Sequence, residues 1–195
     1  MQQKNKRRQQ AEQTKDKLFY AANQLLAERE FEQITVRDIV ARAGVSVGTF
    51  YHHYTNKMEV YYETYRLADR YFTETVAPQL TQPDPAQRIL AFFDHYALYS
   101  SKTSGPRLTR LLYNADNPWF NRDPADGMVG LLTKLVAAGL QSGSLRGADR
   151  AEQIAGWLMV AARGLVYHWC TAGCSYDLPA AMRWYVALLI KAYTL

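Results

Sequence analysis

The sequence predicts an all-α protein in which a small three-helix domain precedes a larger helical domain. Apolar residues recur at helical spacing along most of the 195 residues, and no segment alternates apolar and polar residues as a half-buried strand would. Clusters of Gly, Pro, Ser and Asn separate these segments. Hydrophobic residues make up 48% and charged residues 21% of the chain, which is typical of a globular protein. We expect about nine helices in all, with a first domain over residues 1–57 and a second over 58–195.

The helices are expected in the following order. Residues 1–13 are rich in Gln, Lys and Arg, which predicts either disorder or a frayed helical start. Apolar spacing from Thr14 predicts a first helix that ends near Glu28–Glu30, and two short helices follow it. A longer helix is expected over about Lys57–Val76, ahead of Pro78. The remaining helices are expected over the ranges Ala86–Ser101, Pro106–Asn114, Ala125–Ser142, Arg150–Thr171 and Pro179–Tyr193.

The excess positive charge of the chain lies in its first third. The formal net charge is +5, and residues 1–57 hold ten Lys or Arg against six Asp or Glu, hence +4, while residues 58–195 hold thirteen against twelve, hence +1. Such a concentration is expected where a phosphate backbone is bound. A solvated basic tail around Lys4–Arg8 explains part of the same excess. Charge alone therefore leaves both interpretations open.

Other features exclude several protein classes. The N-terminus is polar and lacks the apolar core of a secretory signal. The longest apolar stretch, Ile154–Thr171, is interrupted by Arg163 and His168, which favours a buried helix over a membrane span. Only two cysteines occur, so no disulfide framework is expected and a reducing compartment fits. We therefore expect a cytoplasmic protein with no membrane partner.

The most informative segment is residues 34–57, ITVRDIVARAGVSVGTFYHHYTNK. Thr35 can cap a helix N-terminus, and Asp38 three residues later completes a capping box. Gly44 ends this helix, because glycine adopts the left-handed conformation that a C-terminal cap needs. Ser46 follows closely and can cap a second short helix. Two short helices joined by a tight glycine turn form the helix-turn-helix plan, here over about residues 35–54, in which the second helix enters the DNA major groove.

The second helix of this motif has two predicted faces. Val47, Phe50 and Tyr54 are expected on its inward face, while Gly48, Thr49 and His52 are left outward, small or polar enough to approach base edges. Asn56 then caps the next helix, with Glu59 three residues on, and Lys57 lies beside that helix N-terminus, a suitable place for a phosphate.

The segment from Thr35 through Ala43-Gly44-Val45-Ser46-Val47-Gly48-Thr49-Phe50-Tyr51 to Tyr54 and Asn56-Lys57 resembles the DNA-binding domain of the TetR family of bacterial one-component regulators, over about residues 14–62. The resemblance implies that Thr35, Tyr51 and Lys57 contact phosphates. It also implies that the residues reading or approaching bases are Arg37, Val47, Gly48, Thr49 and His52. Arg37 is the best candidate for a bidentate guanine contact. His52 departs from the aromatic or basic residue expected at its position, which leaves its partner open.

The resemblance also implies that the second domain binds a ligand and forms a homodimer. The last two predicted helices are apolar on more than one side, with Gly156 and Gly164 allowing close helix approach. A two-fold interface between these helices accounts for the pattern, and a palindromic operator would follow from it. A core buried wholly within one chain is the alternative.

An effector pocket is suggested by fourteen tyrosines and four tryptophans, because aromatic walls suit a small hydrophobic or aromatic ligand. Each aromatic residue taken alone is more often part of a core. The candidate effector-binding residues, placed by family analogy, are Phe93, Tyr96, Tyr113, Trp119, Met128, Leu131, Trp157 and Arg163. Arg163 lies in an apolar helix and needs a partner, either a carboxylate such as Asp94 or Asp126 or an acidic effector.

No catalytic constellation, metal site or cofactor motif is recognised. Cys170 and Cys174 invite a redox or metal interpretation, but no further pair of ligands has suitable spacing, so inert thiols are favoured. We expect neither enzymatic activity nor a cofactor. The predicted function is a DNA-binding repressor released from a palindromic operator by its effector. The alternative is a ligand-independent regulator whose second domain serves dimerisation or binds a protein partner.

Overall fold

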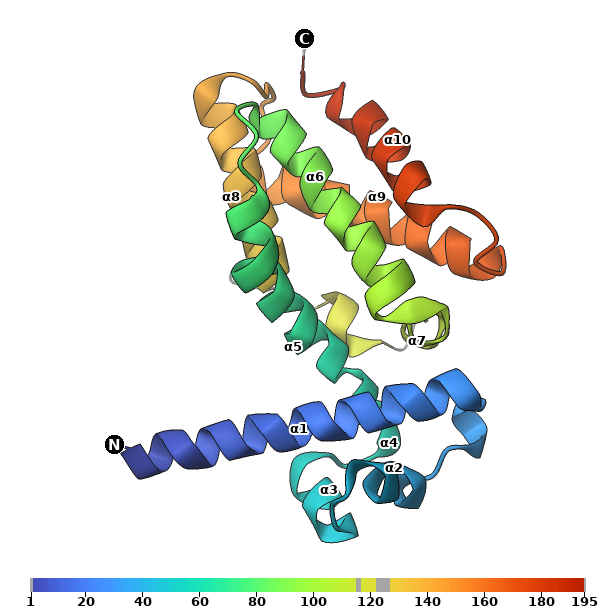
Figure 1. Ribbon diagram of the computed structural model, residues 1–195. Coiled ribbons are helices and arrows are strands. Elements are labelled where there is room, and N and C mark those ends of the chain that lie inside the picture. The colour runs from blue at the N-terminus through green and yellow to red at the C-terminus, as the bar shows by residue number, and fades with distance from the viewer. Residues whose placement is uncertain (1, 115–116, 122–126, 195) are drawn as a thin grey trace. The chain divides into compact units, whose positions relative to one another are not determined.

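The computed structural model describes residues 2–114, 117–121 and 127–194, and within these ranges the chain is helical and contains no strand (Figure 1). The predicted all-α fold is therefore confirmed. The chain divides into an N-terminal unit, Met1–Arg66, and a C-terminal unit, Leu67–Leu195. The division by compactness falls after Arg66, and the assignment of separate functions to residues 1–57 and 58–195 stays a prediction.

The N-terminal unit is built from one long helix and several short ones. These are α1 (Gln2–Glu28), the 3-10 turn η1 (Phe31–Gln33), α2 (Val36–Ala43), α3 (Val47–His53) and α4 (Lys57–Tyr61), after which α5 (Glu63–Arg70) begins. The helix α1 starts at Gln2 and not near Thr14, because Gln, Lys and Arg are good helix formers and extend the amphipathic segment backwards. Of the two expectations for residues 1–13, the helical one is correct.

A small apolar core holds these short helices against α1. Leu18 and Leu25 of α1, Ile39 of α2 and Phe50 of α3 are at most 1% exposed. The hydroxyl of the buried Tyr61 donates a hydrogen bond of 3.2 Å to the carbonyl of Ala22, so the polar end of this ring is satisfied inside the core.

The C-terminal unit contains the remaining helices. After α5 come the π-helical segment η2 (Tyr71–Val76), the 3-10 turn η3 (Ala77–Gln79), α6 (Pro85–Leu98), the π-helical segment η4 (Tyr99–Thr103), α7 (Gly105–Leu112), η5 (Pro118–Asn121), α8 (Gly127–Ser142), α9 (Ala151–Thr171) and α10 (Leu178–Ile190). If α4 and α5 are counted as one helix interrupted at Tyr62, the described residues hold nine α-helices, as predicted.

Two predicted helices differ from the structure in their regularity. The helix expected over Lys57–Val76 is interrupted at Tyr62 and becomes π-helical from Tyr71. The helix expected to run to Ser101 ends as α-helix at Leu98 and continues as η4. A hydrophobic pattern does not distinguish α from π hydrogen bonding over a single turn, which is why the sequence did not predict either change.

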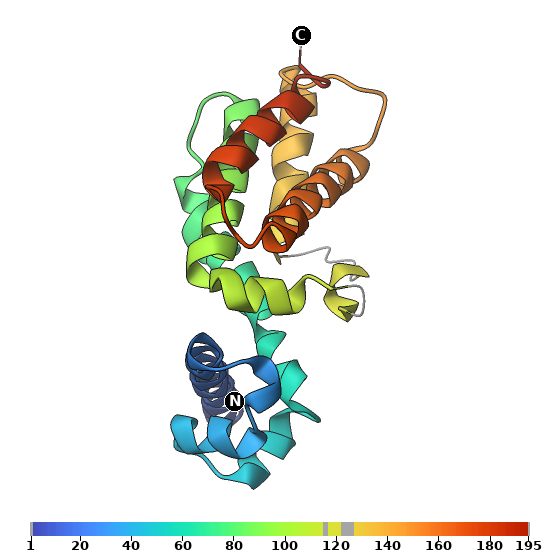
Figure 2. The ribbon, with the colours of Figure 1, turned by 90° about the vertical axis from the view of Figure 1, so that its right-hand side faces the viewer.

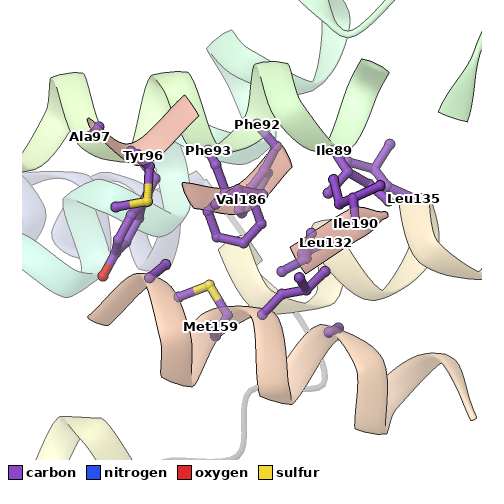
Figure 3. Close-up of a cluster of buried hydrophobic side chains, with 14 of the residues drawn as sticks. Ile89, Phe92, Phe93, Tyr96, Ala97, Leu132, Leu135, Met159, Val186 and Ile190 are labelled. Atoms are coloured by element: carbon purple, nitrogen blue, oxygen red, sulfur yellow. The ribbon is translucent and has the colours of Figure 1, made fainter. Parts of the chain in front are cut away.

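The core of the C-terminal unit surrounds α6, which packs against α8 and α10, while α9 packs against α8 and α10 (Figures 1 and 2). Figure 3 shows side chains of all four helices meeting in one cluster. Phe92 and Phe93 of α6, Leu132 of α8 and Val186 of α10 are fully buried there. None of the helices within the described ranges is long and apolar enough to span a membrane.

Candidate nucleic-acid interface

The helix α2 is fixed at both ends by its own sequence. The Thr35 hydroxyl accepts a 3.2 Å hydrogen bond from the backbone N–H of Asp38, and the Asp38 carboxylate accepts one of 2.8 Å from the N–H of Thr35. This reciprocal pair is the predicted capping box, and it lowers the pKa of Asp38 through hydrogen bonding from Thr35. At the other end Gly44 has φ +69°, and its N–H bonds to the carbonyls of Ala41 and Val40. Both predicted caps are confirmed.

Only Val45 and Ser46 separate Gly44 from the first residue of α3. The Ser46 hydroxyl accepts a 3.0 Å hydrogen bond from the N–H of Thr49, so Ser46 is the N-cap, as predicted. The Asn56 side chain then caps α4 by accepting from the N–H groups of Met58 and Glu59 at 2.9 and 3.1 Å. Glu59 folds back to accept from the N–H of Thr55 at 2.7 Å. Each short helix therefore begins at a side-chain cap.

The two faces of α3 differ sharply in exposure. Phe50 is fully buried and Tyr54 is 5% exposed, so both point into the core, as predicted. Val47 is 42% exposed, so its predicted inward position is wrong. The reason is that Val47 is the first residue of the helix, where no neighbouring turn covers it. Its exposure agrees with the base-facing position that the family resemblance implies.

The outer side of α3 gathers several of the predicted DNA-contacting residues. Tyr51 is 57% exposed, and Gly48 and His52 are exposed beside it. Thr49 is half-buried, and its hydroxyl lies 2.8 Å from that of Ser46. A Cβ placed on Gly48 would meet only the Ser46 hydroxyl, at 3.7 Å. Because space inside the protein does not require glycine there, the missing side chain leaves the outside of the helix free to approach a partner closely.

The arginines near α2 are distinguished by their ion pairs. Arg42 forms two hydrogen bonds, of 2.9 and 3.0 Å, with the carboxylate of Glu28, and Arg29 lies 3.7 Å from Asp38. Arg37 is exposed, and within the part of the chain that the structure describes it forms no ion pair. Of these three arginines, Arg37 is therefore the one whose positive charge is not balanced by a neighbouring carboxylate among the described residues.

Lys57 has a structural role that the sequence did not predict. Its ammonium group donates to the carbonyls of Phe31 and Ile34 at 2.7 and 2.9 Å, and it lies 4.1 Å from the centre of the Phe31 ring. These contacts join the start of α4 to both ends of η1. An ammonium group has three donors, so one remains for the phosphate contact that the resemblance implies.

A buried ion network, also not predicted from the sequence, anchors the end of α3. The carboxylate of Glu63, 7% exposed, accepts hydrogen bonds from the Tyr54 hydroxyl at 2.9 Å and from Arg66 at 2.6 Å, and Lys15 lies 3.1 Å away. Arg66 also pairs with Asp16 and Glu12 of α1. Burial raises the pKa of Glu63, but the hydrogen bonds from Arg66, Lys15 and Tyr54 outweigh it and lower the pKa overall. Burial beside this carboxylate raises the pKa of Tyr54.

In the C-terminal unit, several predicted effector-binding residues lie inside the fold. Phe93 is fully buried and Tyr96 is 7% exposed, with the hydroxyl of Tyr96 hydrogen-bonded to that of Tyr113. Burial raises the pKa of Tyr96, and the charge and hydrogen bonding of Arg163 oppose this rise. The structure therefore brings Phe93, Tyr96, Tyr113 and Arg163 together.

One of the two carboxylates expected beside Arg163 pairs with another arginine. Asp94 forms its ion pair with Arg183 of α10, because its position on α6 faces that helix, so it is not the partner expected for Arg163. Asp126 lies outside the described residues. Arg163 also interacts with the hydroxyl of Tyr96.

The other predicted effector residues are placed less centrally. Trp119, Met128 and Leu131 are half-buried. The N–H of Met128 donates to the Asp69 carboxylate at 2.9 Å, and that of Trp119 to the side chain of Asn117 at 3.0 Å. Trp157 is 64% exposed, so the structure does not bring it together with Tyr96.

Trp157 belongs instead to an exposed apolar surface on α9 and α10, the two helices nearest the viewer in the upper part of Figure 2. This α9–α10 surface comprises Trp157, Val160, Tyr167, Trp184 and Leu188, each of which is between 43% and 66% exposed. On α9 its members are three and seven residues apart and therefore share one face. Gly164 lies within the same repeat, and a Cβ added there would meet nothing within 4 Å.

Comparisons with known proteins agree with this architecture. Residues 18–64 match the family model of bacterial regulatory proteins, tetR family. No curated protein sequence matches the chain significantly. The fold is similar to that of the transcriptional regulator FadR from Bacillus subtilis in complex with stearoyl-CoA, with a TM-score of 0.72 and 20% identity over 89% of this chain and 96% of that one.

Two further solved structures are similar. FadR from Thermus thermophilus, a repressor in complex with lauroyl-CoA, gives a TM-score of 0.69 and 22% identity over 93% of this chain and 95% of that one. SmeT, the repressor of a multidrug efflux pump of Stenotrophomonas maltophilia, gives 0.69 and 16% over 93% of this chain and 90% of that one. At these identities the likeness establishes a shared fold.

The Glu63 network predicts a specific pH dependence of stability. Because the folded-state pKa of Glu63 lies below its ordinary value of 4.5, the ionised carboxylate stabilises the fold above that pH, and this contribution is lost as the pH falls through the folded-state value. Glu63→Gln should lower the free energy of unfolding by about 1–3 kcal/mol near pH 7, and the difference from wild type should shrink as the pH is lowered below 4.5. Urea denaturation at several pH values measures both. Glu32→Gln, which changes an exposed carboxylate of the same unit, is the control, and equal behaviour of the two variants would contradict the assignment.

Proposed function

We propose that this chain, whose residues 18–64 match the family model of bacterial regulatory proteins, tetR family, is a homodimeric repressor that is released from a palindromic operator by a small hydrophobic or aromatic effector. The observation that carries the proposal is the capped pair α2–α3, which presents an exposed, uncharged helix face beside an arginine whose charge is not locally neutralised. Such a regulator would act in the cytoplasm, where its DNA is.

The contacts with DNA follow from the two faces of α3. The buried Phe50 and Tyr54 hold the helix, so Val47, Gly48 and His52 remain to face base edges in the major groove. Arg37 has the charge and the planar donors for a guanine or a phosphate. The exposed hydroxyls of Thr35 and Tyr51 suit phosphate oxygens, and such contacts position the protein without reading sequence.

Dimerisation through α9 and α10 is supported by the α9–α10 surface. Trp157 and Trp184 are 64% and 66% exposed, and exposed apolar patches of this kind mark interaction sites. Aromatic residues are also enriched at the centre of protein interfaces. The open position at Gly164 would let a second helix approach closely. A two-fold dimer of this kind requires a DNA site with two-fold symmetry.

A hydrophobic effector is supported by the group of Phe93, Tyr96, Tyr113 and Arg163. Two tyrosine hydroxyls and one guanidinium are set among apolar side chains, an arrangement typical of ligand sites with few, well-placed polar groups. The FadR proteins similar in fold were solved with acyl-CoA molecules, whose chains are hydrophobic.

A second candidate is a regulator that needs no ligand. Phe93 is fully buried, and the hydroxyls of Tyr96 and Tyr113 satisfy one another, as in a filled core. The two candidates differ in what Tyr96→Phe does. In the ligand-dependent regulator it weakens the release of DNA by an effector, whereas in the ligand-independent one no compound changes DNA affinity at all.

The DNA-facing residues predict two kinds of mutational effect. Arg37→Ala should reduce the slope of log K against log salt by about one, because one cation fewer releases counterions, whereas Tyr51→Phe should weaken binding with little change in slope. Fluorescence anisotropy with a short random-sequence duplex measures both without knowledge of the operator. Arg42→Ala is the matched control, since Glu28 already neutralises Arg42, and an equal loss of slope in both arginine variants would count against the role of Arg37.

The dimer surface predicts that charge placed within it separates the protomers. Trp157→Asp should convert the dimer to monomers and raise the dimer dissociation constant by at least about a hundredfold, the effect of losing a central aromatic contact. Leu98→Asp changes a residue that is also exposed, at 42%, but lies on α6 outside the surface, and it should leave the dimer intact. Analytical ultracentrifugation distinguishes these results, and a Trp157→Asp protein that remains dimeric would exclude this interface.

The effector proposal predicts ligand-dependent release without dissociation of the dimer. Compounds that bind should weaken DNA affinity by about tenfold or more, because a ligand shifts an equilibrium only by its differential affinity for the two states. Anisotropy with long-chain acyl-CoA molecules and flat aromatic compounds, alongside sedimentation of the same samples, makes the test. Unchanged DNA affinity throughout would favour the ligand-independent candidate.

A further inference from the structure

Two thiols meet where α9 ends. Cys170 lies in the last turn of α9 and is 7% exposed, and Cys174 follows in the turn toward α10, where it is half-buried. The turn is closed by backbone hydrogen bonds of 2.8 Å from the N–H of Ala172 to the carbonyl of His168 and from the N–H of Cys174 to that of Trp169. The side chains of the two cysteines interact electrostatically. The four-residue spacing thus brings both thiols to the same end of α9.

Cys174 is held in an unusual backbone conformation. Among the residues that the structure describes, it is the only one other than glycine with a positive φ, at +59°. This left-handed conformation costs an ordinary side chain about 1–2 kcal/mol, so it persists only where the surrounding structure enforces it. Here the enforcing contact is the hydrogen bond from the N–H of Cys174 to the carbonyl of Trp169, which holds the backbone of the turn.

A cation from a different helix completes the cluster. A terminal nitrogen of Arg110, on α7, lies 3.7 Å from the sulfur of Cys174. Reactive cysteines are typically partly exposed and lie beside a cationic side chain, as Cys174 does here. Burial raises the pKa of Cys170 to about 12, with the neighbouring Cys174 adding to the rise and Arg110 opposing it, so Cys170 stays a protonated thiol. The two cysteines are therefore chemically distinct.

We propose that Cys174 is a peroxide-reactive thiol and that Cys170 resolves its oxidised form into an intrachain disulfide. In the first step the Cys174 thiolate attacks hydrogen peroxide, its sulfur loses two electrons, the O–O bond breaks, and a sulfenic acid and hydroxide form. In the second step the Cys170 sulfur attacks the sulfenic sulfur, an S–S bond forms, the S–O bond breaks, and the hydroxyl leaves as water with the proton of Cys170.

Access and order of reaction follow from burial. Cys174 lies between the exposed residues Gly173 and Ser175, so a small neutral oxidant can reach it from solvent, whereas Cys170 is enclosed by the core. The contact between Arg110 and Cys174 links α7 to the turn that joins α9 to α10. The site therefore carries a redox modification independent of DNA or effector binding.

The test uses the reduced full-length protein treated with hydrogen peroxide, followed by mass spectrometry of the intact chain and its peptides. Because the chain has only two cysteines, loss of both free thiols with a 170–174 cross-linked peptide is the expected result, reversed by dithiothreitol. Cys170→Ser should accumulate a sulfenic acid that dimedone traps at Cys174, and Cys174→Ser should react far more slowly. Preferential reaction of Cys170, equal reaction in the two serine variants, or disulfides formed only between chains would overturn the proposal.

The role of Arg110 is tested by rate. Arg110→Gln should slow peroxide consumption by about threefold or more, because it removes the cation that contacts the Cys174 sulfur. Arg107→Gln removes the same charge from the same helix and should leave the rate unchanged. Circular dichroism verifies that each variant is folded. A rate that survives complete unfolding in urea would also contradict the proposal, because the reactivity would then not come from this arrangement.

Discussion

Three helices of five to eight residues carry the surface that we assign to DNA, and none is long enough to be stable in water by itself. Each depends on the side chain that caps its first turn and on apolar contacts with its neighbours, which are α1 for α2 and α4, and α2 for α3. The caps at Thr35, Ser46 and Asn56 satisfy N–H groups that would otherwise lack partners, and Phe50 fills the space between the helices. The position of every outward side chain on α3 follows from these local constraints.

The contacts that hold α3 in place also explain why it has one free face. Tyr54 closes the helix and is bound to Glu63, whose charge is balanced by Arg66 and Lys15, so the inner side of the helix is fully engaged. The outer side carries small or uncharged residues beside Arg37. The C-terminal unit likewise has a buried side and an exposed apolar side. Its aromatic core surrounds α6, while tryptophans on α9 and α10 remain at the surface for a second chain to cover.

What the sequence predicted well was local. The caps, the glycine turn and the buried positions Phe50 and Tyr54 depend on residues a few positions apart, and the structure confirms them. The long-range contacts were not predictable in this way. Lys57 bonds to carbonyls more than twenty positions earlier, and Arg66 reaches Asp16 across the fold. Trp157 was grouped with buried aromatics because a helical pattern that is apolar on several sides does not show which side a second chain would cover. Arg110 and Cys174 are likewise far apart in the chain, so their contact left no sequence signal.

The central claim is that two copies of the α2–α3 pair read a symmetric DNA site together. Selection of tightly bound duplexes from a random pool, followed by hydroxyl-radical footprinting of the enriched sequence, tests it most directly. The account predicts an inverted repeat protected in two symmetric patches whose centres lie on one side of the DNA, about one helical turn or a multiple of it apart. Enrichment of no sequence, or protection of a single unrepeated site, would contradict it.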